Sequence, residues 1–385
     1  MPTAVIVDAI RTPSGRGKPG GALSAWHPVD LLGTVLKAIA ERNGLDTATI
    51  DDVIGGCLSQ VGEQSVNITR NALLAAGFPE SVPGTTVDRQ CGSSQQAAHF
   101  AAQGVIAGAY DIVIACGVEL MSKNPIGYAT LGMDNWGPMV HARYPDGLVG
   151  QGISAELIAA RWGLTREQLD EFSARSHRLA ASADFSSEVL PIGDLTIDET
   201  IRASTTTESL ASLKPAFHDD DLGARFPEID WSVTAGNSSP LTDGASAVLI
   251  MSEEKANQLG LRPRARFHSF AVVGSDPIEM LTGVIPATKR ILERSGLGIN
   301  DIDTFEVNEA FASVPLAWQQ ELGADPEKVN PRGGAIALGH ALGSSGSRLM
   351  TTMLNQLELS GGRYGLQVMC EGAGMANATI IERLS

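Results

Sequence analysis

The fold is decided by the stretch Val87-Asp88-Arg89-Gln90-Cys91-Gly92-Ser93-Ser94-Gln95-Gln96-Ala97-Ala98. Before it, residues 84–87 are short and β-branched, which predicts a strand, and after it residues 95–105 are rich in Ala and Gln, which predicts a helix. Cys91 is therefore expected where a strand turns into a helix N-terminus. The helix dipole and free N–H groups there favour a nucleophilic thiolate over a thiol. The alternative is a small core residue, the commoner state of a lone cysteine.

Strand and helix patterns alternate on both sides of this stretch, which predicts an α/β protein. The predicted strands cover residues 4–9, 50–54, 84–87, 111–116 and 245–251, and the predicted helices cover residues 28–42, 67–76, 95–105, 155–162 and 166–183. Thr165 is the expected N-cap of the last helix. The run from Asp111 to Cys116 is almost continuously apolar, which is typical of a strand buried on both faces.

The regular alternation is interrupted between about residues 119 and 243. Met, Trp, Tyr, Pro and Gly become frequent in residues 124–152, and residues 218–231 are polar, acidic and loop-like. We interpret residues 119–243 as an inserted loop domain that lies over the main body.

The C-terminal part repeats the N-terminal part. The strand at residues 111–116 followed by Gly117 is echoed by residues 365–370 followed by Glu371-Gly372, and the Cys91 turn is echoed by a glycine-rich turn around His340. The repeat distance of roughly 250 residues is far longer than a solenoid period, so it indicates a duplicated half. Two similar halves about a pseudo-twofold axis would bring Cys91 close to Asn308, His340 and Cys370.

Composition limits the classes of function. The net charge of −16 argues against binding to nucleic acid or to an anionic membrane, and no apolar run approaches the roughly 20 residues of a membrane span. The four cysteines form no CxxC pair, so we expect no zinc site or redox motif and a reducing compartment, the cytoplasm. The N-terminal residues predict a first strand and not a signal peptide.

The residues expected at the meeting point favour acyl transfer. Two thiols, an imidazole, an amide and glycine-rich N–H donors suit a thioester intermediate and suit hydride or phosphoryl transfer poorly. Each residue also has a structural alternative: His340 satisfied by local carbonyls, Cys370 a buried strand-end thiol, and Asn308 a cap. A GxGxxG string at residues 15–20 contains Pro19 and does not open a helix, so we expect a flexible surface loop there and not a dinucleotide site.

The chain resembles the thiolase family along nearly its whole length. The matching motifs are Val-Asp-Arg-Gln-Cys91-Gly-Ser, Gly236-Asn237-Ser238-Ser239 with Asp243-Gly244-Ala245, Asn308-Glu309-Ala310-Phe311-Ala312, Asn330 to Gly346 around His340, and Cys370-Glu371-Gly372. They run in the family's order, which makes the match specific. The motifs around Cys91 and Cys370 look more like actinobacterial thiolases of steroid and ring-fragment β-oxidation than like acetoacetyl-CoA-forming enzymes.

The resemblance implies a fold: an αβαβα sandwich of five layers, with an N-terminal domain at residues 1–258 that holds the insertion and a C-terminal domain at residues 263–385. It also implies a homodimer or homotetramer, coenzyme A as a co-substrate, and no permanently bound cofactor or metal.

The family's functional residues carry over one by one. Cys91 matches the acylated nucleophile, and His340 matches its base, which also serves one oxyanion hole. Asn308 matches the residue that holds the water of that hole. Cys370 matches the acid/base at the acetyl-CoA α-carbon. The backbone N–H groups of Cys91 and Gly372 match a second oxyanion hole.

Ser239 matches a contact to the pantetheine arm of CoA. Two positions depart from the family pattern: Ala341 stands where the family usually has proline, and Asp88 where it often has asparagine. We expect Asp88 to point away from the Cys91 sulfur, because neighbouring strand residues alternate faces.

The implied activity is that of a 3-ketoacyl-CoA thiolase acting on acyl-CoA and CoA in fatty-acid or steroid β-oxidation. The aromatic and methionine residues of the segment 124–152 favour a bulky acyl group over a two-carbon one, and the alternative for this segment is a surface excursion or a subunit contact. A biosynthetic acetoacetyl-CoA thiolase, a ketoacyl synthase and an inactive lipid-binding or scaffold protein are the alternatives. Cys370 argues against the synthase, which usually pairs its cysteine with two histidines or with His and Asn.

Overall fold

The computed structural model describes residues 2–384 and contains a mixed sheet of ten strands. The strand order is β4-β3-β5-β6-β1-β7-β10-β9-β8, with β2 paired to β6 beside this path. The strands are β1 (Ala4–Arg11), β2 (Gly15–Arg16), β3 (Asp52–Gly56), β4 (Gly84–Val87), β5 (Ile112–Leu120), β6 (Thr242–Ser252), β7 (Ala265–Gly274), β8 (Thr304–Val307), β9 (Tyr364–Glu371) and β10 (Met375–Arg383).

The sheet consists of two similar halves, as the sequence repeat predicts. In the first half β3 pairs in parallel with β4 and β5, and β6 pairs antiparallel with β5 and β1. In the second half β8 pairs in parallel with β9, and β10 pairs antiparallel with β9 and β7. A parallel bridge between Phe305 and Val329 takes the place of β4. A short antiparallel contact of Val5 and Ile6 with Arg266 and Ala265 joins the two halves, a link that the sequence did not reveal.

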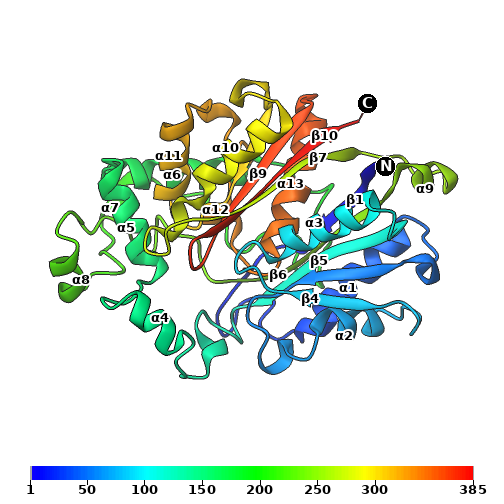
Figure 1. The fold of residues 1–385 in the computed structure, drawn as a ribbon, viewed down its shortest axis with the longest axis horizontal. Helices are drawn as coiled ribbons and strands as arrows, with labels where there is room; N and C mark the ends of the chain where they lie inside the picture. The colour runs from blue at the N-terminus through cyan, green and yellow to red at the C-terminus, as the bar shows by residue number, and fades with distance from the viewer. Residues whose placement is uncertain (1, 385) are drawn as a thin grey trace.

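The two halves of the sheet form two layers of the five-layered sandwich, and helices form the other three layers (Figure 1). The outer helices are α1 (Pro28–Arg42) and α2 (Ile68–Ala75) on the first half, and α10 (Val284–Ser295) and α11 (Ser313–Leu322) on the second. Between the halves lie α3 (Ser93–Ile106) and α13 (Ser345–Ser360), which pack on each other and contact both halves. Neighbouring residues of a strand point to opposite faces of the sheet and so pack against different helix layers. Val5 packs in the core under α1, whereas Ile6 packs against α3 and α13.

The chain between β5 and β6 carries five helices. They are α4 (Gly137–Arg143), α5 (Gln151–Arg161), α6 (Arg166–Ser182), α7 (Thr207–Ala211) and α8 (Asp220–Arg225). Thr165 caps α6 in a capping box with Gln168, as predicted. Two further short helices are α9 (Glu253–Gln258) after β6 and α12 (Ala335–Leu338) before His340.

Two local predictions were wrong. Residues 218–231 are not wholly loop, because the Asp219 side chain accepts a hydrogen bond from Leu222 N and starts α8. The glycine-rich string at residues 15–20 is not simply a surface loop, because Gly15 and Arg16 pair with Asp243 and Thr242 of β6. In the first case the N-cap outweighs the polar composition. In the second, the edge of β6 beyond the end of its pairing with β1 is open and pairs with β2.

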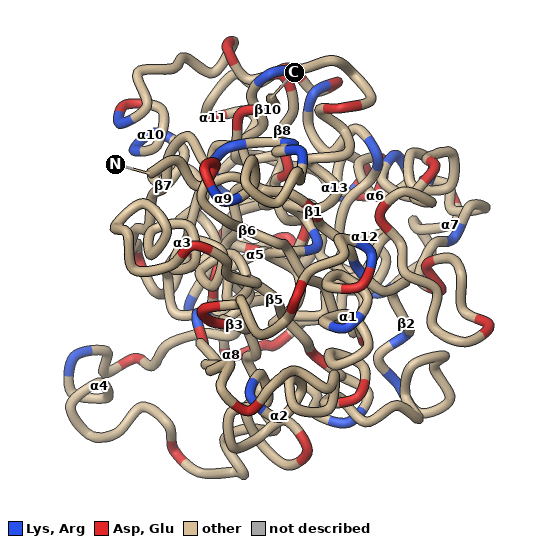
Figure 2. The backbone as a smooth tube through the Cα atoms, turned by 90° about the vertical axis from the view of Figure 1, so that its right-hand side faces the viewer, with Lys and Arg blue, Asp and Glu red and all other residues tan. Residues whose placement is uncertain are grey.

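The segment around α4 is an arm that stands away from the body (Figures 1 and 2). Its apolar side chains are exposed: Tyr128 by 51%, Met133 by 67%, Trp136 by 41% and Met139 by 86%. Within one chain, these side chains therefore do not line an enclosed acyl pocket, which removes the basis for the expectation that they select a bulky acyl group.

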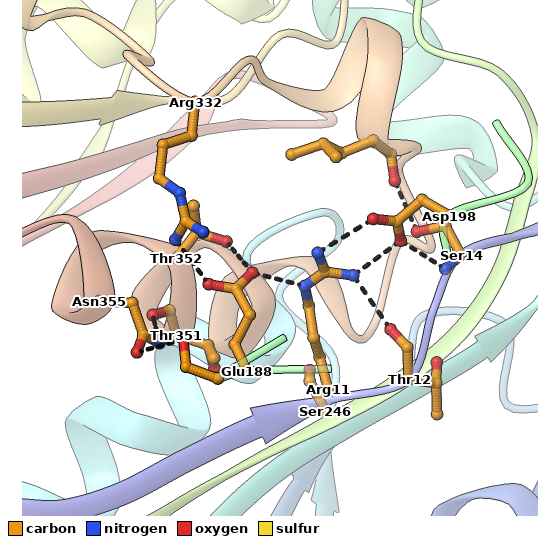
Figure 3. Close-up of polar contacts among 12 residues, drawn as sticks. Arg11, Thr12, Ser14, Glu188, Asp198, Ser246, Arg332, Thr351, Thr352 and Asn355 are labelled. Carbon is orange, nitrogen blue, oxygen red and sulfur yellow. Dashed lines mark hydrogen bonds and ion pairs between the residues drawn. The ribbon is translucent and has the colours of Figure 1, made fainter. Parts of the chain in front are cut away.

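A buried ionic network fastens the chain after α6 to the body (Figure 3). Arg11 of β1 bonds Glu188 at 2.8 Å and Asp198 at 2.7 Å, and Arg332 bonds the second Glu188 oxygen at 2.9 Å. All four side chains are almost wholly buried, and Thr352 of α13 also donates to Glu188.

None of the helices in residues 2–384 is long and apolar enough to cross a membrane.

Candidate active site

Cys91 lies in a tight turn between β4 and α3, where the sequence predicts it. Ser93 closes this turn: its hydroxyl donates to Gln90 O at 2.6 Å and accepts from Arg89 N at 2.9 Å. Gln90 adopts a left-handed conformation with φ of 50°, an uncommon and strained state for a residue with a side chain. Gly92 is required here, because a Cβ atom at this position would collide with the Glu371 carboxyl.

Cys91, Asn308, His340 and Cys370 come together from the two halves, as the repeat predicts. Cys370 is the penultimate residue of β9, Asn308 follows β8, and His340 follows α12. The Asn308 amide nitrogen is 3.4 Å from Nε2 of His340, and the same side chain lies near the Cys370 thiol, where it opposes the rise in the pKa of that thiol. Cys370 in turn lies close enough to Cys91 to raise the pKa of that thiol. All four residues are buried, with exposed fractions of 0–3%.

The halves approach closely at this point because glycines line the contact. A Cβ atom on Gly117, at the inner end of β5, would meet the carbonyl oxygen of Gly343 and the side chain of Ser94. A Cβ atom on Gly343 would meet the backbone of Gly56 and Val118. The absence of side chains at Gly117 and Gly343 lets the loop after His340 rest on the ends of β3 and β5.

The charge state of Cys91 differs from the sequence prediction. Burial, followed by the neighbouring Cys370 and Glu371, raises the pKa of the Cys91 thiol well above its usual value. The helix N-terminus therefore does not produce a resting thiolate, because desolvation of the charged form outweighs the dipole. Burial, followed by the Arg348 charge, lowers the pKa of His340 to about 3. The resting pair is consequently a neutral thiol and a neutral imidazole, which can accept a proton.

The second thiol is also neutral. Burial, followed by the charge of Glu371, raises the pKa of Cys370 to about 12. Burial raises the pKa of Glu371 itself to about 9 against the opposing effect of Arg89. Both groups are therefore protonated near pH 7, and Cys370 can supply a proton within the site.

Three polar residues that hold the His340 loop escaped the sequence analysis. His340 N donates to the Thr242 hydroxyl at 2.9 Å, and His340 Nδ1 lies 2.6 Å from the Ser345 hydroxyl. Glu119, at the end of β5, accepts from Gly343 N at 2.9 Å and also from the backbone of the loop after β3. The only signal for Ser345 was its position five residues after His340, at the start of a helix.

The remaining predicted residues lie around this cluster. Gly372 is buried two residues after Cys370, next to the side chains of Gln90 and Gln151. Ser239 is half-buried, and its N–H donates to Ala310 O at 3.0 Å, beside the loop that follows Asn308. Asp88 is exposed, follows the last residue of β4, and accepts a hydrogen bond from Gln90 N at 2.7 Å, so its carboxylate is engaged by the turn.

Comparison with known proteins agrees with this arrangement. The family model described as the thiolase N-terminal domain matches residues 4–254, and that of the thiolase C-terminal domain matches residues 261–383. The chain is 47% identical to the steroid 3-ketoacyl-CoA thiolase FadA6 of Mycobacterium tuberculosis, over 100% of this chain and 95% of the relative. It is 44% identical to the 3-ketoacyl-CoA thiolase of Klebsiella pneumoniae, over the full length of both chains.

A crystal structure of the Bacillus anthracis acetyl-CoA acetyltransferase is similar to this fold, with a TM-score of 0.88 and 37% sequence identity. The match covers 100% of this chain and 99% of that one. Both family domains, in order and over almost the whole chain, together with full-length relatives, establish that this protein belongs to the thiolase family of acyltransferases.

Proposed function

We propose that this protein is a 3-ketoacyl-CoA thiolase that cleaves its substrate through a thioester on Cys91. The observation that carries the proposal is the buried cluster of Cys91, Asn308, His340 and Cys370 from two halves of the chain. A nucleophile, a base, a donor amide and a second acid in one desolvated site are the groups that such a reaction needs. Coenzyme A is a co-substrate, and no permanently bound cofactor takes part.

In the first step, His340 accepts the proton of the Cys91 thiol as the sulfur attacks the 3-keto carbon of the substrate. The bond between the keto carbon and the α-carbon then breaks, and its electron pair forms the enolate of acetyl-CoA. Cys370 gives its proton to the α-carbon, which releases acetyl-CoA and leaves the shortened acyl group on Cys91. A CoA thiol then gives its proton to the Cys370 thiolate and attacks the thioester, and the released Cys91 sulfur takes back the proton held by the His340 imidazolium.

The negative charges that develop on the enolate oxygen and on the thioester oxygen need hydrogen-bond donors. The imidazolium formed at His340 donates to the oxygen of the enolate, together with a water held by Asn308, whose Oδ1 accepts no hydrogen bond from the described residues. The backbone N–H groups of Cys91 and Gly372 are proposed to serve the thioester oxygen. Ser239 is proposed to contact the pantetheine arm of CoA, because it lies beside the loop after Asn308 at the edge of the cluster.

We infer that the acyl group is that of a fatty acid or of a steroid side chain or ring. Support comes from relatives named 3-ketoacyl-CoA thiolase, one of them a steroid thiolase. The biosynthetic acetoacetyl-CoA thiolase is the second candidate, favoured by the similarity to an acetyl-CoA acetyltransferase. An inactive lipid-binding protein is a remote third.

The same proposal extends to the rest of the molecule. Residues 1–258 and 263–385 are proposed as the two domains, with residues 119–243 inserted in the first. A cytoplasmic homodimer or homotetramer is the proposed form, without nucleic-acid or membrane partners.

The test is thiolysis of a panel of 3-ketoacyl-CoAs that differ in chain length and ring content, with Cys91→Ala as the control. We expect a higher kcat/KM for medium-chain or ring-bearing substrates than for acetoacetyl-CoA, and no turnover by the variant. If acetoacetyl-CoA were the best substrate, the biosynthetic candidate would replace the degradative one. If no substrate were cleaved, the lipid-binding candidate would stand.

A further inference from the structure

We infer that Ser345 is a positioning residue that fixes the tautomer of His340, so that Nδ1 carries the proton and Nε2 is the basic nitrogen. The inference rests on the proposed function, in which His340 takes the proton of Cys91. A neutral imidazole exists as two tautomers, and only the one with a free Nε2 can accept a proton on the side of Asn308.

The first observation is the hydrogen bonding at Nδ1. The Ser345 hydroxyl is 2.6 Å from His340 Nδ1 and 2.9 Å from Ala341 O. The hydroxyl has a single proton, and Ala341 O, which can only accept, is its partner at 2.9 Å. The hydroxyl oxygen then accepts from His340, which requires an Nδ1–H group.

The second observation comes from the opposite side of the ring. The Asn308 amide nitrogen lies 3.4 Å from His340 Nε2. An amide N–H can approach Nε2 only if that nitrogen is unprotonated. In the other tautomer two N–H donors would face each other unless the Asn308 amide turned over. The contacts at the two ring nitrogens thus agree.

The surroundings of the ring favour the neutral form on which this tautomer depends. Arg348, one turn further along α13, is buried, and neither terminal guanidinium nitrogen has a hydrogen-bond partner among the described residues. Its charge opposes protonation of His340. Ser345 and Arg348 therefore act in different ways: the hydroxyl selects which nitrogen holds the single proton, and the guanidinium disfavours a second one.

α13 offers a matched control. Ser347 is also a fully buried serine on this helix, but its hydroxyl lies 2.6 Å from the Ser246 hydroxyl and bonds Ser344 O. Ser347→Ala removes the same group from the same helix and leaves the bond to His340 in place. Any effect of Ser345→Ala that Ser347→Ala does not share belongs to the contact with the imidazole.

The experiment combines nitrogen NMR of labelled histidine with the rate of Cys91 acylation. The chain has seven histidines, and a His340→Gln variant identifies the signal of His340. In the wild type we expect a protonated Nδ1 and an unprotonated Nε2. In Ser345→Ala we expect a mixture of tautomers and a roughly 10- to 100-fold slower acylation, less than the whole contribution of a general base because the reactive tautomer remains populated. Ser347→Ala should show the wild-type tautomer and a rate within about threefold of the wild type.

A wild-type spectrum with the proton on Nε2 would overturn the inference, even if Ser345→Ala did not fold. An unchanged tautomer and an unchanged acylation rate in Ser345→Ala would overturn it as well. Failure of the proposed function is distinguishable, because it would appear as an unmodified wild-type Cys91 with every acyl-CoA, whereas the tautomer is measured on the resting protein without substrate.

Discussion

The carboxyl group of Glu371 lies against the α-carbon of Gly92, the residue after Cys91, so that no side chain fits there. Neither carboxyl oxygen has a hydrogen-bond donor among the described residues, and the same holds for the adjacent Asn377 Oδ1. Both groups lie beside Gly92 and lack such a donor, and both are satisfied if Glu371 is protonated and donates to Asn377. This agrees with the pKa of Glu371, which burial raises to about 9.

Glu371→Gln should make stability less dependent on pH. The native state retains a proton on Glu371 between about pH 4.5 and pH 9 that the unfolded chain has lost, so the free energy of unfolding of the wild type falls as pH rises. The loss approaches about 1.4 kcal/mol per pH unit for one proton. The amide introduced by the substitution cannot ionise. The free energy of unfolding of the variant, relative to that of the wild type, should therefore rise by about 1 kcal/mol per pH unit between pH 6 and pH 8.

Urea unfolding of both proteins at pH 6, 7 and 8 measures this difference. Other groups with raised pKa values, such as Glu306, contribute equally to both proteins and cancel. Parallel curves of unfolding free energy against pH would show that Glu371 is ionised in the native state throughout this range.

Glu188→Gln should destabilise the protein strongly. Glu188 is the common partner of Arg11 and Arg332, so the substitution removes the carboxylate that pairs with Arg332 and one of the two that pair with Arg11, which retains Asp198. Removing one partner of a buried ion pair costs about 3–5 kcal/mol. Urea unfolding measures the change. The control is Glu41→Gln, which removes an exposed partner of Lys37 and should change stability by less than about 0.5 kcal/mol.

A loss below about 1 kcal/mol in Glu188→Gln would show that water or neighbouring groups compensate the two arginines. In that case the network in Figure 3 would not fasten the chain after α6 to β1.

Much of the fold could be predicted from the sequence because the local signals were strong. The helix at residues 28–42 and the strand at residues 84–87 have the predicted limits, the first because Pro28 opens the helix and Asn43-Gly44 ends it. The meeting of Cys91 with Asn308, His340 and Cys370 followed from the internal repeat, which fixes which strand ends share an edge.

The rest could not be predicted because it depends on contacts between distant segments. The neutral state of Cys91 results from burial by both halves, whereas the sequence showed only the local helix N-terminus. The bond between Ser345 and His340 depends on how the glycine-rich loop folds back. The exposure of the α4 arm likewise depends on its path away from the body and not on its aromatic composition.

Cys91→Ala should abolish formation of an acyl-enzyme. In the wild type, incubation with an acyl-CoA followed by peptide mass spectrometry should find the acyl group on Cys91. The other three cysteines are also free and buried, so they serve as internal controls. An adduct confined to Cys57, Cys116 or Cys370 would contradict the assignment of the nucleophile.

Cys370→Ala should separate the two thiols by function. The Cys91 thiol and the His340 imidazole remain, so the variant should still accept an acyl group from an acyl-CoA. Cleavage and formation of the C–C bond should fall by about 10²–10⁴-fold, because the proposed proton donor to the acetyl-CoA α-carbon is lost. Exchange of the acetyl-CoA methyl protons with D₂O, followed by NMR, should stop.

The matched control is Cys116→Ala, which removes a buried thiol from the outer face of β5, in the core under α1 and away from the cluster. Burial raises the pKa of Cys116 too, so the two thiols differ in position and not in their resting charge. Cys116→Ala should retain exchange and thiolysis. Normal methyl-proton exchange in Cys370→Ala would mean that another group carries the α-carbon proton, and Glu371, a neutral acid beside Cys370, would be the next residue to test.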